Sequence, residues 1–287
     1  MKTIGVIGAG TMGSGIAYLG ALAKFEVRLY DLNDSILETA RTKIRDNLAK
    51  GVEKKLLSAD DAKNAEKQIH LTTDISHLAP SDVVIEAAAE DLKIKQELFK
   101  KLSHAVRPSA ILATNTSSLS ITEIASAIDN PERMVGLHFF NPAHIMKLVE
   151  VVYGHRTSME TVAAVVDLAK RFGKQSVLVK DTPGFIVNRV ARPFYGEALR
   201  LLGEGVSSVE EIDRIVRLEG GFKMGPFELM DLIGIDVNYA VTKSVYEQFF
   251  HEPRFRPHPI QKQMVDAGMI GKKVGKGFYD YGKNDKK

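Results

Sequence analysis

The sequence predicts an α/β protein in which a mostly parallel sheet is followed by a smaller all-helical region. Three observations support this prediction. A strand, a glycine turn and a helix open the chain, apolar runs then alternate with helical patterns as far as about residue 182, and few strand signals follow. Strands that alternate with helices form parallel sheets with helices on both faces. We therefore expect one domain over residues 1–183 and a second over residues 184–287.

The first element is a buried strand over residues 3–7, a glycine turn and a helix over residues 14–24. Gly8, Gly10 and Gly13 follow the pattern GxGxxG. The first glycine permits a tight turn, the second lets the backbone approach a phosphate, and the third lets the helix pack closely on the strand. The amides that open such a helix can bind a pyrophosphate.

A second strand over residues 27–31 ends in Asp31, roughly twenty residues after the glycines. A carboxylate at this place accepts a hydrogen bond from a ribose 2′-hydroxyl and would repel a 2′-phosphate. The pattern therefore predicts a Rossmann-type domain that binds NAD rather than NADP. A glycine-rich turn that binds nothing is the alternative.

Further apolar strands are expected over residues 82–86, 111–115, 134–138, 148–152 and 176–179. Ser120 and Glu123 form a capping-box pattern, which marks a helix start after the strand over residues 111–115. Ligands of such sheets bind at the carboxyl ends of the strands. Polar residues that follow these runs are therefore the candidates for a site.

The region after residues 181–184 reads as amphipathic helices. We expect one over residues 185–202, one that starts after Ser208 and one that opens at Gly225. A small helical domain with this much apolar surface needs a partner to cover it. We therefore expect a homodimer formed through the helical domain.

Composition excludes several classes of function. The chain of 287 residues contains no cysteine, so disulfides, thiolate metal sites and cysteine nucleophiles are excluded, and no metal site is predicted. A formal net charge of +3 does not favour nucleic acid as a partner. No apolar run reaches the roughly 18 residues that span a bilayer, and the first motif leaves no room for a signal peptide. We expect no membrane association and a cytoplasmic location.

The best candidate for proton transfer is His138, at the end of a predicted strand. Histidine can take and return a proton near neutral pH, which hydride transfer from an alcohol to NAD requires. Glu150 lies inside an otherwise apolar strand, where a carboxylate is costly unless it is paired. A pair with His138 would fix the imidazole tautomer. A structural histidine is the alternative.

Two further polar groups are candidates for holding the substrate oxygen. Residues 115–119, Asn-Thr-Ser-Ser-Leu, follow a predicted strand, and the hydroxyl groups there point to the same crevice as His138. A helix-capping turn explains this segment equally well. Asn188 lies on an otherwise apolar helix face, where a buried amide must find a partner.

Lys43, Asn47, Lys50 and Lys54 recur at spacings of three and four and form one helical stripe. Such a stripe is usually a solvated face. Its position after the second strand suggests a more specific alternative, in which the stripe binds the phosphate-bearing tail of a substrate.

Together these segments resemble the L-3-hydroxyacyl-CoA dehydrogenase family, most closely its bacterial 3-hydroxybutyryl-CoA dehydrogenases. The resemblance runs in order along nearly the whole chain, over residues 8–13, 115–119, 138–142, 180–189, 225–231 and 275–281. It implies that His138 is the catalytic acid/base with Glu150 as its partner, and that Ser117 and Asn188 bind the substrate carbonyl or hydroxyl. It also implies cofactor contacts from Asp31, Glu90, Lys95, Asn115, Ser117, Asn141 and Lys273, and contacts of Lys50 and Lys54 with CoA. Asn47 stands where some relatives have a serine.

The resemblance implies NAD-dependent interconversion of (S)-3-hydroxyacyl-CoA and 3-oxoacyl-CoA with short acyl chains, and a homodimer. Two other interpretations stay open. A dehydrogenase of a free hydroxy acid would keep the fold without CoA, and the lysine stripe argues weakly against it. A non-catalytic NAD-binding relative would have no need of His138 and Glu150 together.

Overall fold

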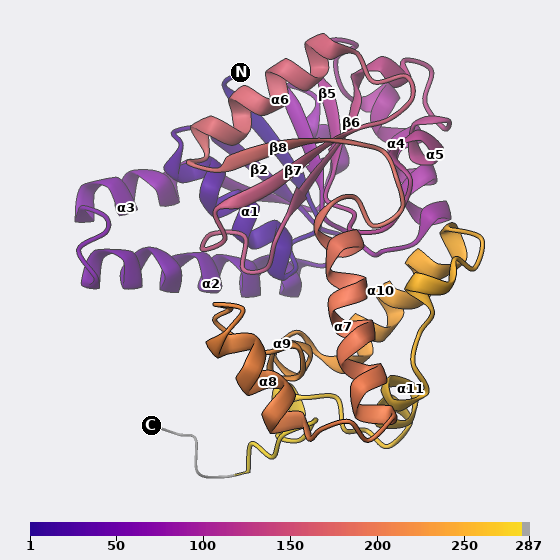
Figure 1. Ribbon diagram of the computed structural model, residues 1–287. Helices are drawn as coiled ribbons and strands as arrows, with labels where there is room; N and C mark the ends of the chain where they lie inside the picture. Colours follow the sequence, from indigo (N-terminus) through magenta and orange to yellow (C-terminus); the bar gives the residue numbers. More distant parts are fainter. Residues whose placement is uncertain (283–287) are drawn as a thin grey trace. The chain divides into compact units, whose positions relative to one another are not determined.

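The computed structural model describes residues 1–282. Contacts between residues divide the chain into two compact units, the first Met1–Thr182 and the second beginning at Pro183 (Figure 1). Each unit has a hydrophobic cluster of its own. Among the described residues, no helix is both long and apolar enough to cross a membrane.

One sheet organises the first unit. Its strand order is β3-β2-β1-β4-β5-β6-β7-β8, and every neighbouring pair is parallel except β6 and β7. The predicted α/β class with a mostly parallel Rossmann-type sheet is confirmed. The strands are β1 (Thr3–Ile7), β2 (Glu26–Tyr30), β3 (Ile69–Thr72), β4 (Val83–Glu86), β5 (Ile111–Thr114), β6 (Met134–Phe139), β7 (Leu148–Tyr153) and β8 (Gln175–Lys180).

Helices cover both faces of this sheet. Alternate strand residues, such as Val135 and Leu137 of β6, join the apolar cluster that α1, α2 and α6 complete. Gly136 lies between them and faces the other side, where a Cβ would come 2.8 Å from Ile121 of α5. The helices of this unit are α1 (Thr11–Leu22), α2 (Asp34–Glu53), α3 (Ala59–Lys67), α4 (Leu92–Ala105), α5 (Ile121–Ala125) and α6 (Met159–Arg171), with short 3-10 turns η1 (Ile75–Leu78) and η2 (Pro131–Arg133).

The second unit is helical, as predicted. Ser208 caps α8 by accepting a hydrogen bond from the Glu211 amide, and Gly225 precedes α9. Its elements are α7 (Val187–Gly203), α8 (Val209–Leu218), α9 (Pro226–Ile233), α10 (Ile235–Gln248) and α11 (Pro259–Asp266), with 3-10 turns η3 (Pro253–Phe255) and η4 (Lys272–Val274).

Two buried aspartates hold the end of the described chain to these helices. Asp213 accepts hydrogen bonds from the Phe227 and Glu228 amides that open α9 and from the Tyr279 hydroxyl, each at 2.9 Å. Asp231 accepts from the amides of Phe278 and Tyr279 at 2.9 Å. Both carboxylates are fully buried, and these donors offset the cost of burying a charge.

Some predicted boundaries are wrong. The helix expected from residue 185 begins at Val187, because Phe185 has a φ of 50°, in the left-handed region. The first helix, expected over residues 14–24, spans Thr11–Leu22 instead. Lys24, two residues beyond its end, has a φ of 64°. The edge strand β3 was not predicted, since its residues Ile-His-Leu-Thr are only half-buried and carry little apolar signal.

Candidate active site

The glycine turn after β1 leaves space that the described chain does not fill. Gly8 has a φ of 87°, and a Cβ there would come 2.6 Å from the Ala87 carbonyl oxygen. A Cβ on Gly13 would come 1.7 Å from the Gly8 oxygen, so the helix could not approach the turn. At Gly10, by contrast, no described atom beyond the two adjacent residues lies within 4 Å of the Cβ position, and α1 begins there without a side-chain cap. Backbone amides at a helix start that no side chain caps, beside space that the chain does not fill, fit a pyrophosphate.

Asp31 lies directly beside this turn. The Gly8 amide donates to the carbonyl of Tyr30, the last residue of β2, at 2.9 Å. The Asp31 carboxylate then accepts from the Ala9 amide at 2.8 Å and from the Asn33 amide at 3.2 Å. It is half-buried, so its remaining lone pairs can accept from a ribose hydroxyl.

We expect Asp31→Ala to narrow a preference for NADH over NADPH, mainly by weakening NADH. A hydrogen bond to a charged group contributes about 1.5–3 kcal/mol, and the Ala9 amide also loses its acceptor. The dissociation constants of both dinucleotides measure this effect. Asp34→Ala, three residues further along in the first turn of α2, is a control with the same charge change. Tighter binding of NADPH than NADH by the unaltered chain would contradict the assignment.

Strand register brings the predicted residues to one edge of the sheet. Neighbouring strands align Tyr30, Ile7, Glu86, Thr114 and Gly136 side by side in that order. The turns that follow β1, β2, β4 and β5, and the end of β6, therefore lie at the same edge. This is the edge at which open α/β sheets bind ligands.

His138 and Glu150 meet across β6 and β7. They are direct partners in the antiparallel register, so their side chains leave the sheet on the same face. The His138 Nδ1 lies 2.7 Å from Glu150 Oε2. The glutamate is fully buried and the histidine is 6% exposed. A carboxylate only accepts, so Nδ1 carries a proton and donates it, which leaves Nε2 as the nitrogen that can take up another.

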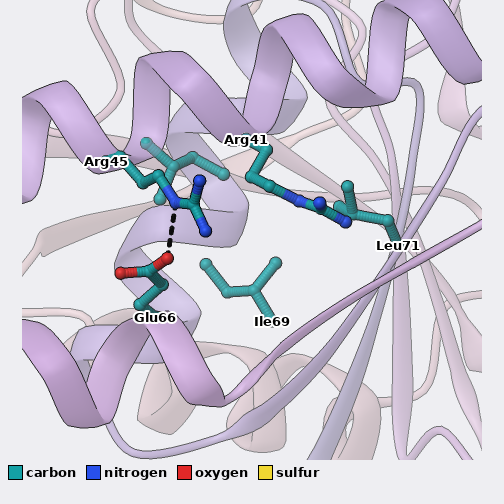
Figure 2. A pocket seen from close by; sticks show the side chains of 6 residues that line it. Arg41, Arg45, Glu66, Ile69 and Leu71 are labelled. Carbon is teal, nitrogen blue, oxygen red and sulfur yellow. Dashed lines mark hydrogen bonds and ion pairs between the residues drawn. The ribbon is translucent and has the colours of Figure 1, made fainter.

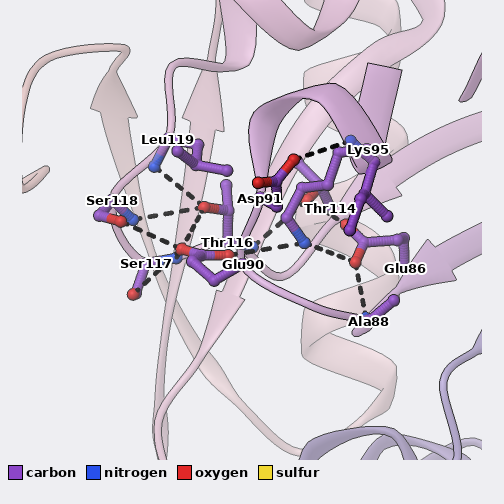
Figure 3. Close-up of polar contacts among 11 residues, drawn as sticks. Glu86, Ala88, Glu90, Asp91, Lys95, Thr114, Thr116, Ser117, Ser118 and Leu119 are labelled. Atoms are coloured by element: carbon purple, nitrogen blue, oxygen red, sulfur yellow. Dashed lines mark hydrogen bonds and ion pairs between the residues drawn. The ribbon is translucent and has the colours of Figure 1, made fainter. Parts of the chain in front are cut away.

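Glu90 organises the turn after β5 (Figure 3). Its Oε1 accepts from the Thr116 hydroxyl at 2.6 Å, from the Ser117 amide at 3.0 Å and from the Ser118 hydroxyl at 3.1 Å. Burial alone would raise the pKa of Glu90, but the Lys95 ammonium and these donors hold that pKa below its usual value. The carboxylate therefore stays charged and fixes the position of Ser117.

Asn115 and Asn141 have different surroundings. The Asn115 side-chain oxygen accepts from the Phe139 amide at 2.8 Å and so ties the end of β5 to β6 beside His138. Asn141 is exposed, three residues beyond the histidine. A cofactor contact of either residue stays a prediction.

The lysine stripe of α2 faces a cavity of about 210 Å³. Lys43, Asn47 and Lys50 line it together with the start of α1 and with Pro142 and His144, which follow β6. Lys54 does not belong to the lining and lies just past the end of α2. The stripe thus has a hollow beside it at its first three positions, close to the segment that follows His138.

A second cavity, of about 200 Å³, lies between α2, α3 and β3 (Figure 2). Its apolar wall is formed by Ile44, Ile69 and Leu71. Arg45, which also lines the cavity, forms an ion pair with Glu66, as Figure 2 shows. None of the predicted site residues lines this cavity.

Two family models match this chain. The 3-hydroxyacyl-CoA dehydrogenase NAD binding domain matches residues 3–182, and the 3-hydroxyacyl-CoA dehydrogenase C-terminal domain matches residues 184–281. The chain belongs to the 3-hydroxyacyl-CoA dehydrogenase family. The resemblance seen in the sequence is confirmed, and with it NAD as the cofactor of the first domain.

Individual relatives agree with this assignment. A 3-hydroxyadipyl-CoA dehydrogenase of Escherichia coli is 50% identical over 98% of this chain, which spans 59% of that protein's length. A probable 3-hydroxybutyryl-CoA dehydrogenase of Bacillus subtilis is 42% identical over 98% of both chains. The crystal structure of an (S)-3-hydroxybutyryl-CoA dehydrogenase from Ralstonia eutropha matches with a TM-score of 0.95 and 39% identity, over 99% of this chain and all of the other.

The remaining predicted residues belong to the family's C-terminal domain. Asn188 lies in the first turn of α7, where its carbonyl accepts from Arg192 Nε at 3.1 Å. It is half-buried rather than buried as expected. Lys273 donates to both carboxylate oxygens of Asp236 at 2.7 Å. The substrate role of Asn188 and the cofactor role of Lys273 stay predictions.

Sequence reasoning missed one group in the NAD-binding domain. Glu86 ends the buried strand β4 and is fully buried. It accepts from Lys95, from the Ala88 amide and from the Thr114 hydroxyl. The signal that points to Glu150, a carboxylate inside an apolar strand, is equally present at this position.

Proposed function

We propose that this chain catalyses the NAD-dependent interconversion of (S)-3-hydroxyacyl-CoA and 3-oxoacyl-CoA, with short acyl chains as substrates. The observation that carries the proposal is the buried pair of His138 and Glu150 at the sheet edge that also holds the glycine turn. A proton-transfer group beside a dinucleotide site is the arrangement that an alcohol dehydrogenation requires. The family assignment supports the substrate class.

In the oxidative direction His138 takes the proton of the substrate hydroxyl on Nε2. NAD, when bound, supplies the acceptor for the hydride that leaves C3. Glu150 faces Nδ1 at 2.7 Å and stabilises the imidazolium that forms, because an anion in a buried site interacts strongly with a new cation. In the reductive direction the same histidine returns the proton to the developing alkoxide. Ser117, which the Glu90 carboxylate holds in the same domain, is the group that we assign to the reacting oxygen.

Turnover with matched substrates tests this proposal. NADH oxidation is measured with acetoacetyl-CoA, with 3-oxoadipyl-CoA and with free acetoacetate, since the relatives named above include enzymes for both acyl groups. We expect acyl-CoA substrates to have at least tenfold higher kcat/KM than the free acid, because binding energy from the CoA is used at the reacting centre. Equal values for free acetoacetate would favour the hydroxy-acid dehydrogenase.

The lysine stripe predicts how CoA is held. We expect Lys50→Ala to raise the KM for acetoacetyl-CoA by about twofold to fivefold, the range of an exposed ion pair, and Lys54→Ala to have a smaller effect because it lies outside the cavity. High salt should reduce both effects. Lys63→Ala and Lys67→Ala, at two exposed lysines on α3, are control variants that each lose the same single charge. An equal rise in KM for a pantetheine thioester that lacks the nucleotide phosphates would contradict a phosphate contact.

We propose further that residues 1–183 form the NAD-binding domain, that residues 184–287 form a substrate and dimerisation domain, and that the chain is a homodimer. Exposed apolar side chains in the helical unit support a covered face, among them Val190, Ile215, Leu218 and Phe222, each more than half exposed. Sedimentation of the purified chain measures its mass in solution. A monomer at micromolar concentration would contradict the dimer.

A further inference from the structure

Glu86 joins the turn after β4 to the end of the neighbouring strand β5 (Figure 3). It is the last residue of β4, and its Oε1 accepts from the Ala88 amide at 2.6 Å, within the turn after β4. Its Oε2 accepts from the hydroxyl of Thr114, the last residue of β5, also at 2.6 Å. The turn after β4 in turn lies against the glycine turn, since a Cβ on Gly8 would meet the Ala87 oxygen.

The same carboxylate holds a buried lysine. Lys95 Nζ donates to Glu86 Oε1 at 2.5 Å and lies 3.5 Å from Glu90 Oε2. The lysine side chain is 1% exposed and Glu86 is fully buried, whereas the Glu90 side chain is 39% exposed. The ammonium group therefore bridges an interior carboxylate to one at the surface of the site.

We propose that Glu86 is a positioning residue for NAD binding: through Lys95 it fixes Glu90, and through Glu90 it fixes the turn of Thr116, Ser117 and Ser118. The chain of contacts runs from a buried anchor to the backbone amide of Ser117. This inference rests on the proposed function, because it concerns the NAD site of that activity. Because Glu86 is fully buried, we assign it an action on the site only through its neighbours.

Stability alone does not require this pair. Burying a carboxylate and an ammonium costs about as much as their attraction returns, and apolar residues of similar volume often stabilise a core equally well. Position is the property that an apolar pair could not supply. Glu86 accepts from three donors on its two oxygens, and the ammonium that it holds lies 3.5 Å from Glu90 Oε2.

NADH titration of Glu86→Gln tests the proposal without acyl-CoA. The chain contains no tryptophan, so the fluorescence of bound NADH is read without that background. The glutamine side chain is neutral, so Glu86 no longer competes with Glu90 for the Lys95 ammonium. Lys95 is then drawn toward Glu90. We expect the NADH dissociation constant to rise about tenfold or more, as for loss of a hydrogen bond to a charged group.

A double-mutant cycle separates positioning from general damage. In a Glu90→Gln background, Glu86→Gln should change NADH affinity by less than twofold, because the link through Lys95 no longer ends on a charge. Arg133→Met is the control: this buried arginine precedes β6 and donates to the carbonyls of Ser103 and Arg107. It should lower the free energy of unfolding and leave NADH affinity unchanged.

Glu86→Asp keeps the charge that Lys95 needs and serves where the glutamine variant does not fold. Its shorter side chain cannot reach every donor, so we expect NADH binding several-fold weaker than in the unaltered chain, with the same loss of effect in the Glu90→Gln background. Unchanged NADH affinity in these variants, or additive effects of the two glutamates, would overturn the proposal. If the unaltered chain bound no NADH, both this proposal and the proposed function would be overturned. If the chain bound NADH but turned over a different substrate, only the proposed function would be overturned.

Discussion

Replacement of His138 by glutamine is expected to lower kcat by about 10²–10⁴, the range that a positioned general acid or base contributes. The glutamine amide can still donate to Glu150, which the histidine contacts at 2.7 Å, so the buried carboxylate keeps a donor and the fold loses little. What is lost is a group that takes and returns a proton. Steady-state turnover of acetoacetyl-CoA with NADH measures kcat, and an NADH titration checks that the cofactor still binds.

His104→Gln is the matched control, because this histidine is exposed on the last turn of α4. It should leave kcat unchanged. If His138→Gln kept kcat within a few-fold of the unaltered chain, His138 would be a structural histidine and the proton would have to pass through another group. Loss of NADH binding together with kcat would also argue against an acid/base role.

Glu150→Gln is expected to reduce kcat by about 10²–10⁴, although the residue makes no proton transfer itself. The glutamine amide can donate to Nδ1, which favours the tautomer with the proton on Nε2. The nitrogen that should accept the substrate proton is then already occupied. The imidazolium also loses its buried anion, since Glu150 is fully buried. NADH affinity and the free energy of unfolding are measured beside kcat.

The two variants together should be no slower than the slower single variant, because the pair acts as one unit. Additive losses would show that His138 and Glu150 work independently. A large loss of stability in Glu150→Gln with activity retained per folded molecule would assign the carboxylate to folding. Full activity would show that the pairing has no part in catalysis.

Local patterns predicted much of this protein. The glycine turn and the strand before it follow from short-range sterics, and the helix starts at Ser120 and Ser208 from side chains that accept backbone hydrogen bonds, as the structure bears out. Glu150 was found because a carboxylate in an apolar strand contradicts its surroundings. In the structure it contacts His138, and the catalytic role of the pair stays a prediction.

Local patterns do not predict features that depend on contacts between distant segments of the chain. Residues 69–72 form an edge strand because β2 offers a row of backbone partners, not because of their own apolar signal. The Phe185 backbone takes a left-handed conformation that its sequence does not indicate. Lys50 and Lys54 look equivalent in spacing, yet only Lys50 lines the cavity beside α1, because the helix ends before Lys54.

The sequence by itself determined the fold class, the family and the residue types available for chemistry, since each depends on spacings within short segments. Tertiary structure alone decided which of those residues meet. His138 and Glu150 become partners through the antiparallel register of β6 and β7, and Glu86 reaches Lys95 and Thr114 because three segments converge at one sheet edge. Hydrogen bonds of this kind depend on distances of about 3 Å. Such distances between remote residues are set by packing of the whole domain.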